Sequence, residues 1–173
     1  MDPKKKVALD DIDKKIIALL QKDPNITHSQ IAERVGRSQP TIGARLKKLK
    51  KSGVLNVNAG LNLRVLDVYL SIVRLKTENP SEIVGMAEHC PFIANCFKSS
   101  GDYNMILFLV STNLEKLYGL VNSHFRNKEQ IDDVNMEIVV EIARDYIVPV
   151  NLELQEQLDP GSGECVYCKK FFS

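Results

Sequence analysis

The sequence has no apolar run that approaches the roughly 18 residues needed to cross a bilayer. Its first residues, 1–7, are rich in lysine and lack the apolar stretch of a secretory signal. We therefore expect a cytoplasmic protein with no membrane contact. Hydrophobic residues make up 44% of the 173 residues, so the chain can bury one substantial core or two small ones and is not a disordered protein.

The sequence also lacks the residue patterns of common catalytic sites. It has no phosphate-binding glycine loop, no Ser-His-Asp pattern and no paired carboxylates in the arrangement of an acid and a base. Its three histidines, His28, His89 and His124, fall in unrelated predicted elements. We therefore expect that the protein is not an enzyme.

The small net charge of +1 hides an uneven distribution of charge along the chain. Up to Asn56 there are 13 Lys and Arg against 6 Asp and Glu, a net charge of +7, whereas the rest has 10 against 16, a net charge of −6. A basic segment joined to an acidic one is typical of a polyanion-binding module attached to a domain of another kind. Lysines that only keep helix faces in water would give the same charge, so charge alone leaves both interpretations open.

The basic segment has the periodicity of three short helices. Apolar residues recur at helical spacing over 9–21, with aspartates in the first turn, where the helix dipole favours negative charge. Residues 27–30 form a capping box that begins a second helix, which ends at Gly36. Ser38 can cap a third helix, and Pro40 is tolerated in its first turn.

The second and third helices have the features of a helix-turn-helix. This motif needs a small residue where the helices cross, a glycine in the turn and an apolar anchor on the second helix, and Ala32, Gly36 and Ile42 supply them. A three-helix bundle used for protein contacts is the alternative, which the basic charge and the polar outer face disfavour. The predicted DNA-binding residues are Ser38, Gln39, Pro40, Thr41, Ala44, Arg45, Lys47 and Lys48.

These side chains divide into base-reading and phosphate-binding groups. Gln39 can form two hydrogen bonds with adenine, and Arg45 can reach guanine or a phosphate. The Thr41 methyl group or Ala44 can contact the methyl group of thymine. Lysines are expected at phosphates, which position a protein on DNA without specifying sequence. They are Lys47, Lys48, Lys50 and Lys51.

Beyond Gly53 the pattern of secondary structure changes. Residues 54–57 are short and strand-like, and 57–64 read as a linker rich in Asn and Gly. The elements that follow alternate as strand, helix, strand, strand, helix and strand, which is the ferredoxin-like order. The predicted strands are 65–76, 92–99, 105–111 and 134–142, and the predicted helices are 80–89 and 113–125.

The fold class is therefore α+β, with four segments along the chain. We predict a helix-turn-helix domain over 1–56, a linker over 57–64 and a βαββαβ domain over 65–148. A C-terminal extension, which contains a Cys-x-x-Cys motif and a short helix from about 152 to 158, occupies 149–173.

Four motifs, in this order and spacing, resemble the Lrp/AsnC or feast/famine family of bacterial and archaeal transcription regulators, in its archaeal type. They are Leu9–Ile16, Ile31–Ser38, the stretch from Arg45 to Leu55, and Gly101–Asn104. The resemblance extends from Leu9 to about Ile147.

The resemblance implies an N-terminal winged helix-turn-helix and a C-terminal effector domain, called RAM. It also implies homodimers, which in this family often assemble into octamers. Dimerisation has a physical motive as well, because a sheet with helices on one face leaves the other face bare. A two-fold dimer would present two recognition helices to a pseudo-palindromic site.

Members of this family commonly bind amino acids at a cleft between subunits, near the turn after the second strand of the RAM domain. This resemblance would place an effector at or beside that turn. Ordinary turn chemistry is the alternative explanation for Asp102 and Asn104. The candidate effector-binding residues are Gly101, Asp102, Tyr103 and Asn104.

The sequence thus predicts a sequence-specific DNA-binding transcription regulator that responds to an amino acid or a related small molecule. An architectural protein that organises DNA with little sequence specificity is the alternative, because octamers can wrap DNA. The expected partners are double-stranded DNA, further copies of the chain and a small-molecule effector, with no cofactor required.

The stretch after Pro149 is longer than the family usually carries, and it contains Cys165 and Cys168. Two cysteines at this spacing can bind one zinc ion, but a structural site needs four ligands. A reversible disulfide between the two, or exposed thiols with no role, are the other interpretations. The further zinc ligands would come from the same pair in a partner subunit or from His89, Cys90 or Cys96.

Overall fold

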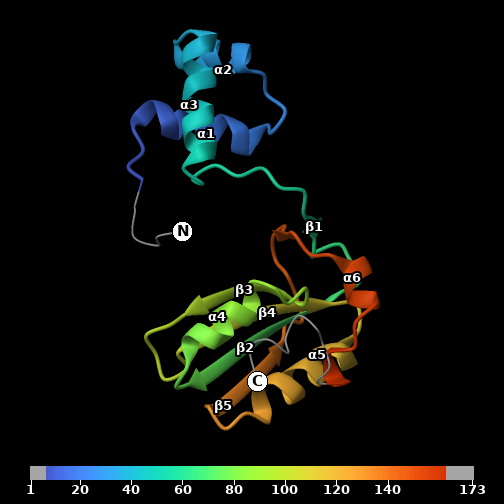
Figure 1. Ribbon diagram of the computed structural model, residues 1–173. Coiled ribbons are helices and arrows are strands. Elements are labelled where there is room, and N and C mark those ends of the chain that lie inside the picture. Colours follow the sequence, from blue (N-terminus) through green and yellow to red (C-terminus); the bar gives the residue numbers. More distant parts are fainter. Residues whose placement is uncertain (1–6, 163–173) are drawn as a thin grey trace. The chain divides into compact units, whose positions relative to one another are not determined.

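The computed structural model describes residues 7–162. They form two compact units, and the boundary along the chain lies between Asn58 and Ala59 (Figure 1). This boundary falls inside the segment predicted as a linker, 57–64. Over the described residues, no helix combines the length and the apolar character that a membrane crossing requires.

The first unit is a bundle of three helices, α1 (Asp11–Lys22), α2 (His28–Val35) and α3 (Gln39–Lys51). Its core is formed by apolar residues that recur at helical spacing within the helices, and three isoleucines, one from each helix, have no exposed surface. The predicted helices are confirmed to within about two residues at each end. The fully buried isoleucines are Ile16, Ile31 and Ile42.

Side chains fix the beginning of each of these helices. Thr27 and Gln30 form the predicted capping box of α2. Asp10 and Asp13 form a second capping box at α1, which the sequence analysis treated only as favourable charge. Ser38 begins α3 as expected, but its hydroxyl pairs with the Thr41 hydroxyl at 2.8 Å.

The turn between α2 and α3 depends on Gly36. This residue has a φ of +67°, in the left-handed region, and its neighbour Arg37 donates its backbone N–H to the carbonyl oxygen of Ala32 at 3.0 Å. The predicted glycine in the turn is therefore confirmed.

The strand predicted over 54–57 is wrong. The backbone N–H groups of Val54 and Leu55 both donate to the carbonyl oxygen of Leu49, which closes the end of α3. Leu55 then packs against the core of the first unit. These two residues therefore finish the helix instead of pairing with a strand.

The second unit is a four-stranded antiparallel sheet with two helices packed against one face (Figure 1). Its order along the chain is the predicted one, strand, helix, strand, strand, helix, strand, and the strands lie in the order β3-β4-β2-β5. The elements are β2 (Tyr69–Thr77), α4 (Pro80–Ala87), β3 (Ile93–Lys98), β4 (Met105–Ser111), α5 (Leu114–Val121) and β5 (Ile131–Ile138).

The last strand is displaced from its predicted range of 134–142. β5 pairs with β2 from Ile131, opposite Thr77, to Ile138, opposite Ser71. One further hydrogen bond joins the Val139 N–H to the Leu70 carbonyl oxygen, and there the strand ends. The partner strand therefore decides where pairing begins and ends.

The sheet buries one face under the helices. The side chains of Val73, Leu75, Met105 and Leu107 point to this face and are fully buried with α4 and α5.

The predicted helix over 113–125 is split into α5 and a π-helical turn, η1 (Asn122–Arg126).

Two short segments that are far apart in the sequence pair beside this sheet. β1 (Leu61–Asn62), in the predicted linker, pairs with β6 (Ile147–Val148). α6 (Leu152–Glu156) and a 3-10 turn, η2 (Pro160–Ser162), follow.

The turn η2 is held against two neighbouring elements of the second unit. η2 packs on α5 and η1: the Ser123 hydroxyl donates to the Pro160 carbonyl oxygen at 2.8 Å. A Cβ atom added at Gly119 would lie 2.9 Å from Gly161 Cα, so the two backbones meet closely.

Candidate nucleic-acid interface

The outer face of α3 carries most of the side chains predicted to contact DNA. Ile42, Leu46 and Leu49 turn inward and are buried, so the residues between them face solvent. The structure thus brings seven of the eight predicted residues together on one exposed surface around the first two-thirds of the helix. They are Ser38, Gln39, Pro40, Thr41, Ala44, Lys47 and Lys48.

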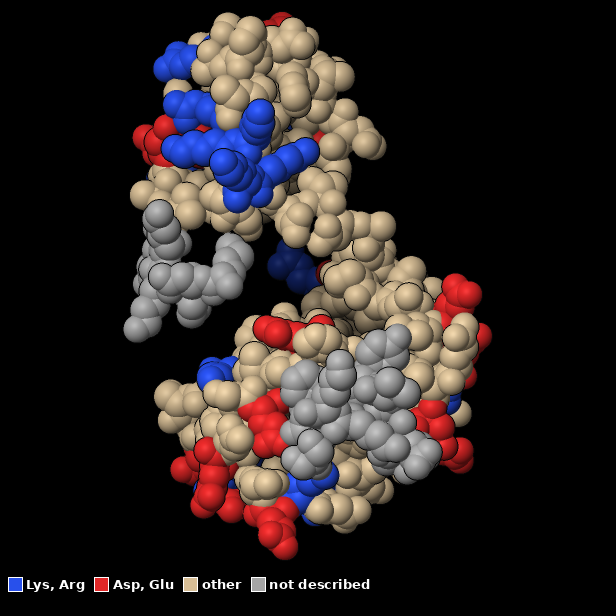
Figure 2. Space-filling view, viewed as in Figure 1, with Lys and Arg blue, Asp and Glu red and all other residues tan. Residues whose placement is uncertain are grey.

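Lysine and arginine side chains gather on one face of the first unit, as Figure 2 shows. α3 ends with Lys48, Lys50 and Lys51. The ion pairs of the described residues involve Lys14, Lys76 and three arginines, and none involves a lysine of α3. These lysines therefore have no carboxylate partner within residues 7–162, and their positive charge faces solvent.

Arg45 differs from the lysines of α3 because its side chain is ion-paired. Its Nη1 donates to Asp13 Oδ1 at 2.8 Å and to Asp10 Oδ2 at 2.6 Å, so its guanidinium is held against the first turn of α1. Asp13 is only 5% exposed, which makes it an acceptor that needs a partner. The hydrogen bond from Arg45 keeps the pKa of Asp10 below its ordinary value, and the two carboxylates raise the pKa of Arg45.

This pairing is a role that sequence reasoning missed. Asp10 and Asp13 are separated by three residues at a helix start, which is the spacing of a capping box. That spacing could have shown that both carboxylates turn back onto the helix end. It could not have shown that Arg45 reaches them from 32 residues away along the chain.

The candidate effector residues lie at the turn between β3 and β4. The side chain of Asn104 forms two hydrogen bonds with the backbone of Thr77 at the end of β2. Its Nδ2 donates to the Thr77 carbonyl oxygen at 2.7 Å, and its Oδ1 accepts from the Thr77 N–H at 3.0 Å. The Tyr103 hydroxyl donates to Asp133 Oδ2 at 2.8 Å, and this bond raises the pKa of Tyr103. Gly101 and Asp102 are exposed at the tip of the turn.

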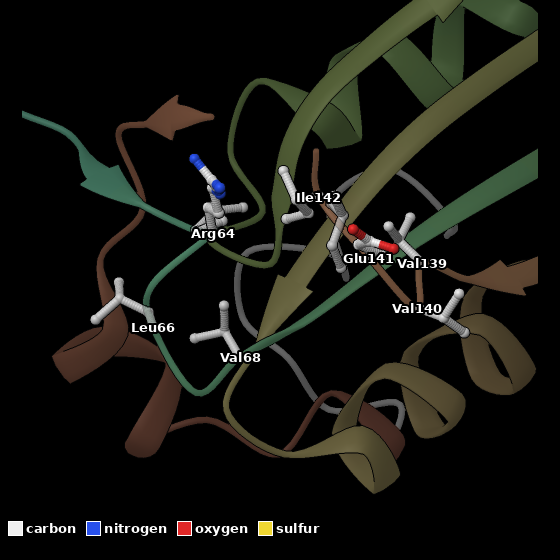
Figure 3. A pocket seen from close by; sticks show the side chains of 9 residues that line it. Arg64, Leu66, Val68, Val139, Val140, Glu141 and Ile142 are labelled. Carbon is white, nitrogen blue, oxygen red and sulfur yellow. The ribbon is translucent and has the colours of Figure 1, made fainter. Parts of the chain in front are cut away.

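A cavity of about 390 Å³ lies at the opposite end of the sheet, where β2 begins and β5 ends (Figure 3). Seven of its nine lining residues are aliphatic, and the other two, Arg64 and Glu141, add one charge of each sign. This cavity is not among the sites predicted from the sequence. The four residues of the predicted effector turn are not part of its lining. The lining residues are Leu63, Arg64, Leu66, Val68, Leu70, Val139, Val140, Glu141 and Ile142.

The helix-free face of the sheet is divided between apolar and charged side chains. Phe97 of β3 packs edge-on against Phe108 of β4, with 5.6 Å between ring centroids, and Phe97 is 44% exposed. Toward β5, Arg74 donates to Glu137 Oε1 at 2.6 Å and to Asn135 Oδ1 at 3.2 Å. This face therefore presents an apolar area next to a polar one.

The predicted metal ligands Cys165 and Cys168 lie outside the described residues. Within residues 7–162, no group of three or more His, Cys, Asp and Glu side chains is placed to hold a metal ion. Cys90 is buried, and the half-buried position of Cys96 raises the pKa of its thiol to about 11, which disfavours a reactive thiolate.

Comparison with known proteins adds three similarities. A family model described as winged helix-turn-helix DNA-binding matches residues 9–56. The chain is 34% identical to the HTH-type transcriptional regulator FL11 of Pyrococcus furiosus over 113 residues, which are 63% of this chain and 75% of that protein. It is 31% identical to the leucine-responsive regulatory protein of Rhizobium meliloti over 147 residues, 81% of this chain and 94% of that protein.

The fold also matches a solved structure. The transcriptional regulator NMB0573 of Neisseria meningitidis, crystallised as a complex with L-Met, superposes with a TM-score of 0.65 at 22% identity. The match covers 87% of this chain and all of that one, so both units share the fold of that protein.

Proposed function

The chain belongs to the Lrp/AsnC family of DNA-binding transcription regulators, and from this premise we propose that it recognises a specific operator as a homodimer and responds to an amino acid. The first unit is the DNA-binding module, and the second is the module for assembly and effector binding. The observation that carries the proposal is the outer face of α3, where exposed polar side chains lie directly outside a buried apolar stripe.

In this proposal the N-terminal half of α3 lies in the major groove. Gln39 and Thr41 are exposed at its first turn, the part of a recognition helix that approaches base edges. Lys47 and Lys48 follow about two turns later, where the DNA backbone passes. Arg45 has a supporting role instead, because its guanidinium is paired with two carboxylates of the same unit.

A second copy of the chain is proposed to cover the helix-free face of the sheet. Exposed Phe97 and half-buried Phe108 form an apolar area that an identical area can bury across a two-fold axis. The ion-paired Arg74 and Glu137 would lie at the border of that contact. Sedimentation analysis of Phe97→Glu tests this: the variant should be monomeric, and an unchanged dimer would place the contact elsewhere.

DNA recognition is tested by selecting random duplexes against heavy non-specific competitor. We expect one pseudo-palindromic sequence to be recovered. Gln39→Ala should lose about 1–3 kcal/mol of discrimination at one base pair in each half-site, because two hydrogen bonds to that base disappear. Lys48→Ala is the matched control, and it should weaken binding to all sequences alike.

Two results would contradict this proposal. Retention of all sequences with equal affinity would favour an architectural protein with little sequence specificity. No retention of any duplex would remove DNA recognition by α3.

The effector is tested at the turn between β3 and β4. L-Met and the other standard amino acids are titrated into the operator complex, and Asp102→Ala, which changes an exposed residue of this turn, should abolish any shift. Asn104→Ala is unsuitable alone, since it also removes two hydrogen bonds to Thr77. A shift that survives in Asp102→Ala would direct attention to the cavity beside Arg64 and Glu141.

A further inference from the structure

The cavity at the start of β2 lies between two segments of the second unit, one that precedes β2 and one that follows β5 (Figure 3). Backbone hydrogen bonds join these segments on both sides of the cavity. On one side the Val139 N–H donates to the Leu70 carbonyl oxygen at 2.8 Å. On the other side the Leu63 N–H donates to the Tyr146 carbonyl oxygen at 2.9 Å. The backbone therefore frames the cavity between two fixed points.

Between these two points the segment after β5 has backbone donors that the fold does not use. Within residues 7–162, the N–H groups of Val140, Glu141 and Ile142 donate to no acceptor. All three residues line the cavity. A backbone N–H needs an acceptor, which is water or a bound group, so these donors are available to the oxygen atoms of a ligand.

The cavity carries one charge of each sign, and the two charges come from different segments. Arg64 lies before β2, and its ion pair within the described part of the chain is with Asp145 at 3.5 Å. Both of these side chains are more than half exposed, so the pair is weak, and the guanidinium keeps donors for a further carboxylate. Glu141 lies after β5 and forms no ion pair with any residue of 7–162, so its carboxylate is available to a cation.

The chemistry of the lining defines the kind of ligand that fits. Besides Arg64 and Glu141, the lining consists of leucine, valine and isoleucine side chains. A ligand with a carboxylate, an ammonium group and an aliphatic part matches a cavity with a cation, an anion and aliphatic walls. A ligand with only one charge would leave either Arg64 or Glu141 without a partner in the complex.

We propose that this cavity binds an aliphatic zwitterion, which is a free amino acid or a short peptide. Arg64 and the free N–H groups hold its carboxylate, and Glu141 holds its ammonium group. This site is distinct from the turn between β3 and β4, which lies at the other end of the sheet. A bound ligand joins the segment before β2 to the segment after β5. Its effect on operator binding rests on the proposed function, because the first of these segments continues from the DNA-binding unit.

Calorimetric titration of the full-length protein is the first test. L-leucine and dileucine are compared, and the one that binds more tightly identifies the ligand as a free amino acid or a peptide. Two analogues of that compound follow, its amide, which lacks the carboxylate, and its deamino analogue, which lacks the ammonium group. Each analogue should bind about tenfold more weakly or worse, because hydrogen bonds to one charged group are lost.

Two variants assign the charges of the ligand to the two side chains. Arg64→Gln should no longer distinguish the zwitterion from its amide, and Glu141→Gln should no longer distinguish it from the deamino analogue. Asp145→Asn is the matched control, because it removes the ion-pair partner of Arg64 and leaves the lining intact. This control should discriminate among the compounds as the wild type does, and circular dichroism verifies the fold of each variant.

NMR of leucine and valine methyl groups in the full-length protein locates the bound compound. The signals of Leu66, Val68 and Val139, which line the cavity, should shift on binding. The signal of Val134 should not shift, because this residue follows Asp133, which contacts the turn between β3 and β4.

Three results would overturn this inference. They are no binding of either compound, unchanged discrimination in both Arg64→Gln and Glu141→Gln, and methyl shifts at Val134 without shifts at the cavity. The last result would place the ligand at the turn and leave the proposed function standing. These measurements contain no DNA, so a failure to select an operator would contradict the proposed function and not the cavity site.

Discussion

The guanidinium of Arg45 lies 2.8 Å from the carboxylate of Asp13, so one side chain of the recognition helix is joined to the first turn of α1. Asp13 is 5% exposed, and without Arg45 its charge would be buried with one partner fewer. We therefore expect Arg45→Ala to lower Tm clearly more than Arg34→Ala, which changes an exposed arginine of α2.

The same pair predicts a dependence on acid. The pKa of Asp10 is held below its ordinary value, mainly by the hydrogen bond from Arg45, so this group stabilises the folded state above that ordinary value. The stabilisation is lost as pH falls through the lower, folded-state pKa. Arg45→Ala should therefore be less sensitive to acid than the wild type in urea titrations between pH 5 and 2. Identical acid curves would contradict the pairing.

The same chemical change should have opposite effects at two glycines of the first unit. Gly36→Ala places a side chain on a backbone with φ of +67°, and we expect it to cost about 1 kcal/mol although a Cβ atom would meet no neighbour. Gly43→Ala lies inside α3 and should gain about 0.5–1 kcal/mol. Thermal and urea unfolding measure both, and a stabilising effect of Gly36→Ala would contradict the left-handed conformation at Gly36.

His124 should make the second unit less stable in mild acid. It is 4% exposed in η1, and burial, with a smaller effect of Lys128, lowers its pKa below 6.5. When folding lowers the pKa of a histidine, its neutral form contributes fully to the free energy of unfolding above the unfolded-state pKa. That contribution is lost as the pH decreases below about 6.5. His124→Asn should remove this loss between pH 7 and 5. The free energy of unfolding in urea, measured for the wild type and His124→Asn at each pH, checks this, and equal pH profiles would contradict it.

The contact between Gly119 and Gly161 should hold η2 on α5. A methyl group at Gly119 would lie 2.9 Å from a backbone atom, which cannot yield as a flexible side chain can. Gly119→Ala should therefore expose residues 159–162 to proteolysis and faster hydrogen exchange, while Glu115→Ala, one turn earlier and exposed, should leave both rates unchanged. Equal rates in the two variants would show that the close contact does not hold this segment.

Local patterns determined much of this protein before any contact between distant residues was considered. Three local patterns act over a few residues and define the three helices: the capping box of Thr27 and Gln30, the glycine at Gly36 and the apolar residues at helical spacing. The same holds for the order of strands and helices in the second unit. The polar outer face of α3 follows as well, because it is what remains once the buried stripe is known.

Only the tertiary structure decided the features that depend on a partner far along the chain. The ion pairs of Arg45 with Asp10 and Asp13 form because the packing of the helices brings the first turn of α1 beside α3. The side chain of Asn104 bonds the backbone of Thr77 because the fold places the two side by side, and the ends of β5 are set by its pairing with β2 from Thr77 to Ser71. Sequence periodicity states which side of an element is buried, but the partner of a charge or a backbone group is set by packing between elements.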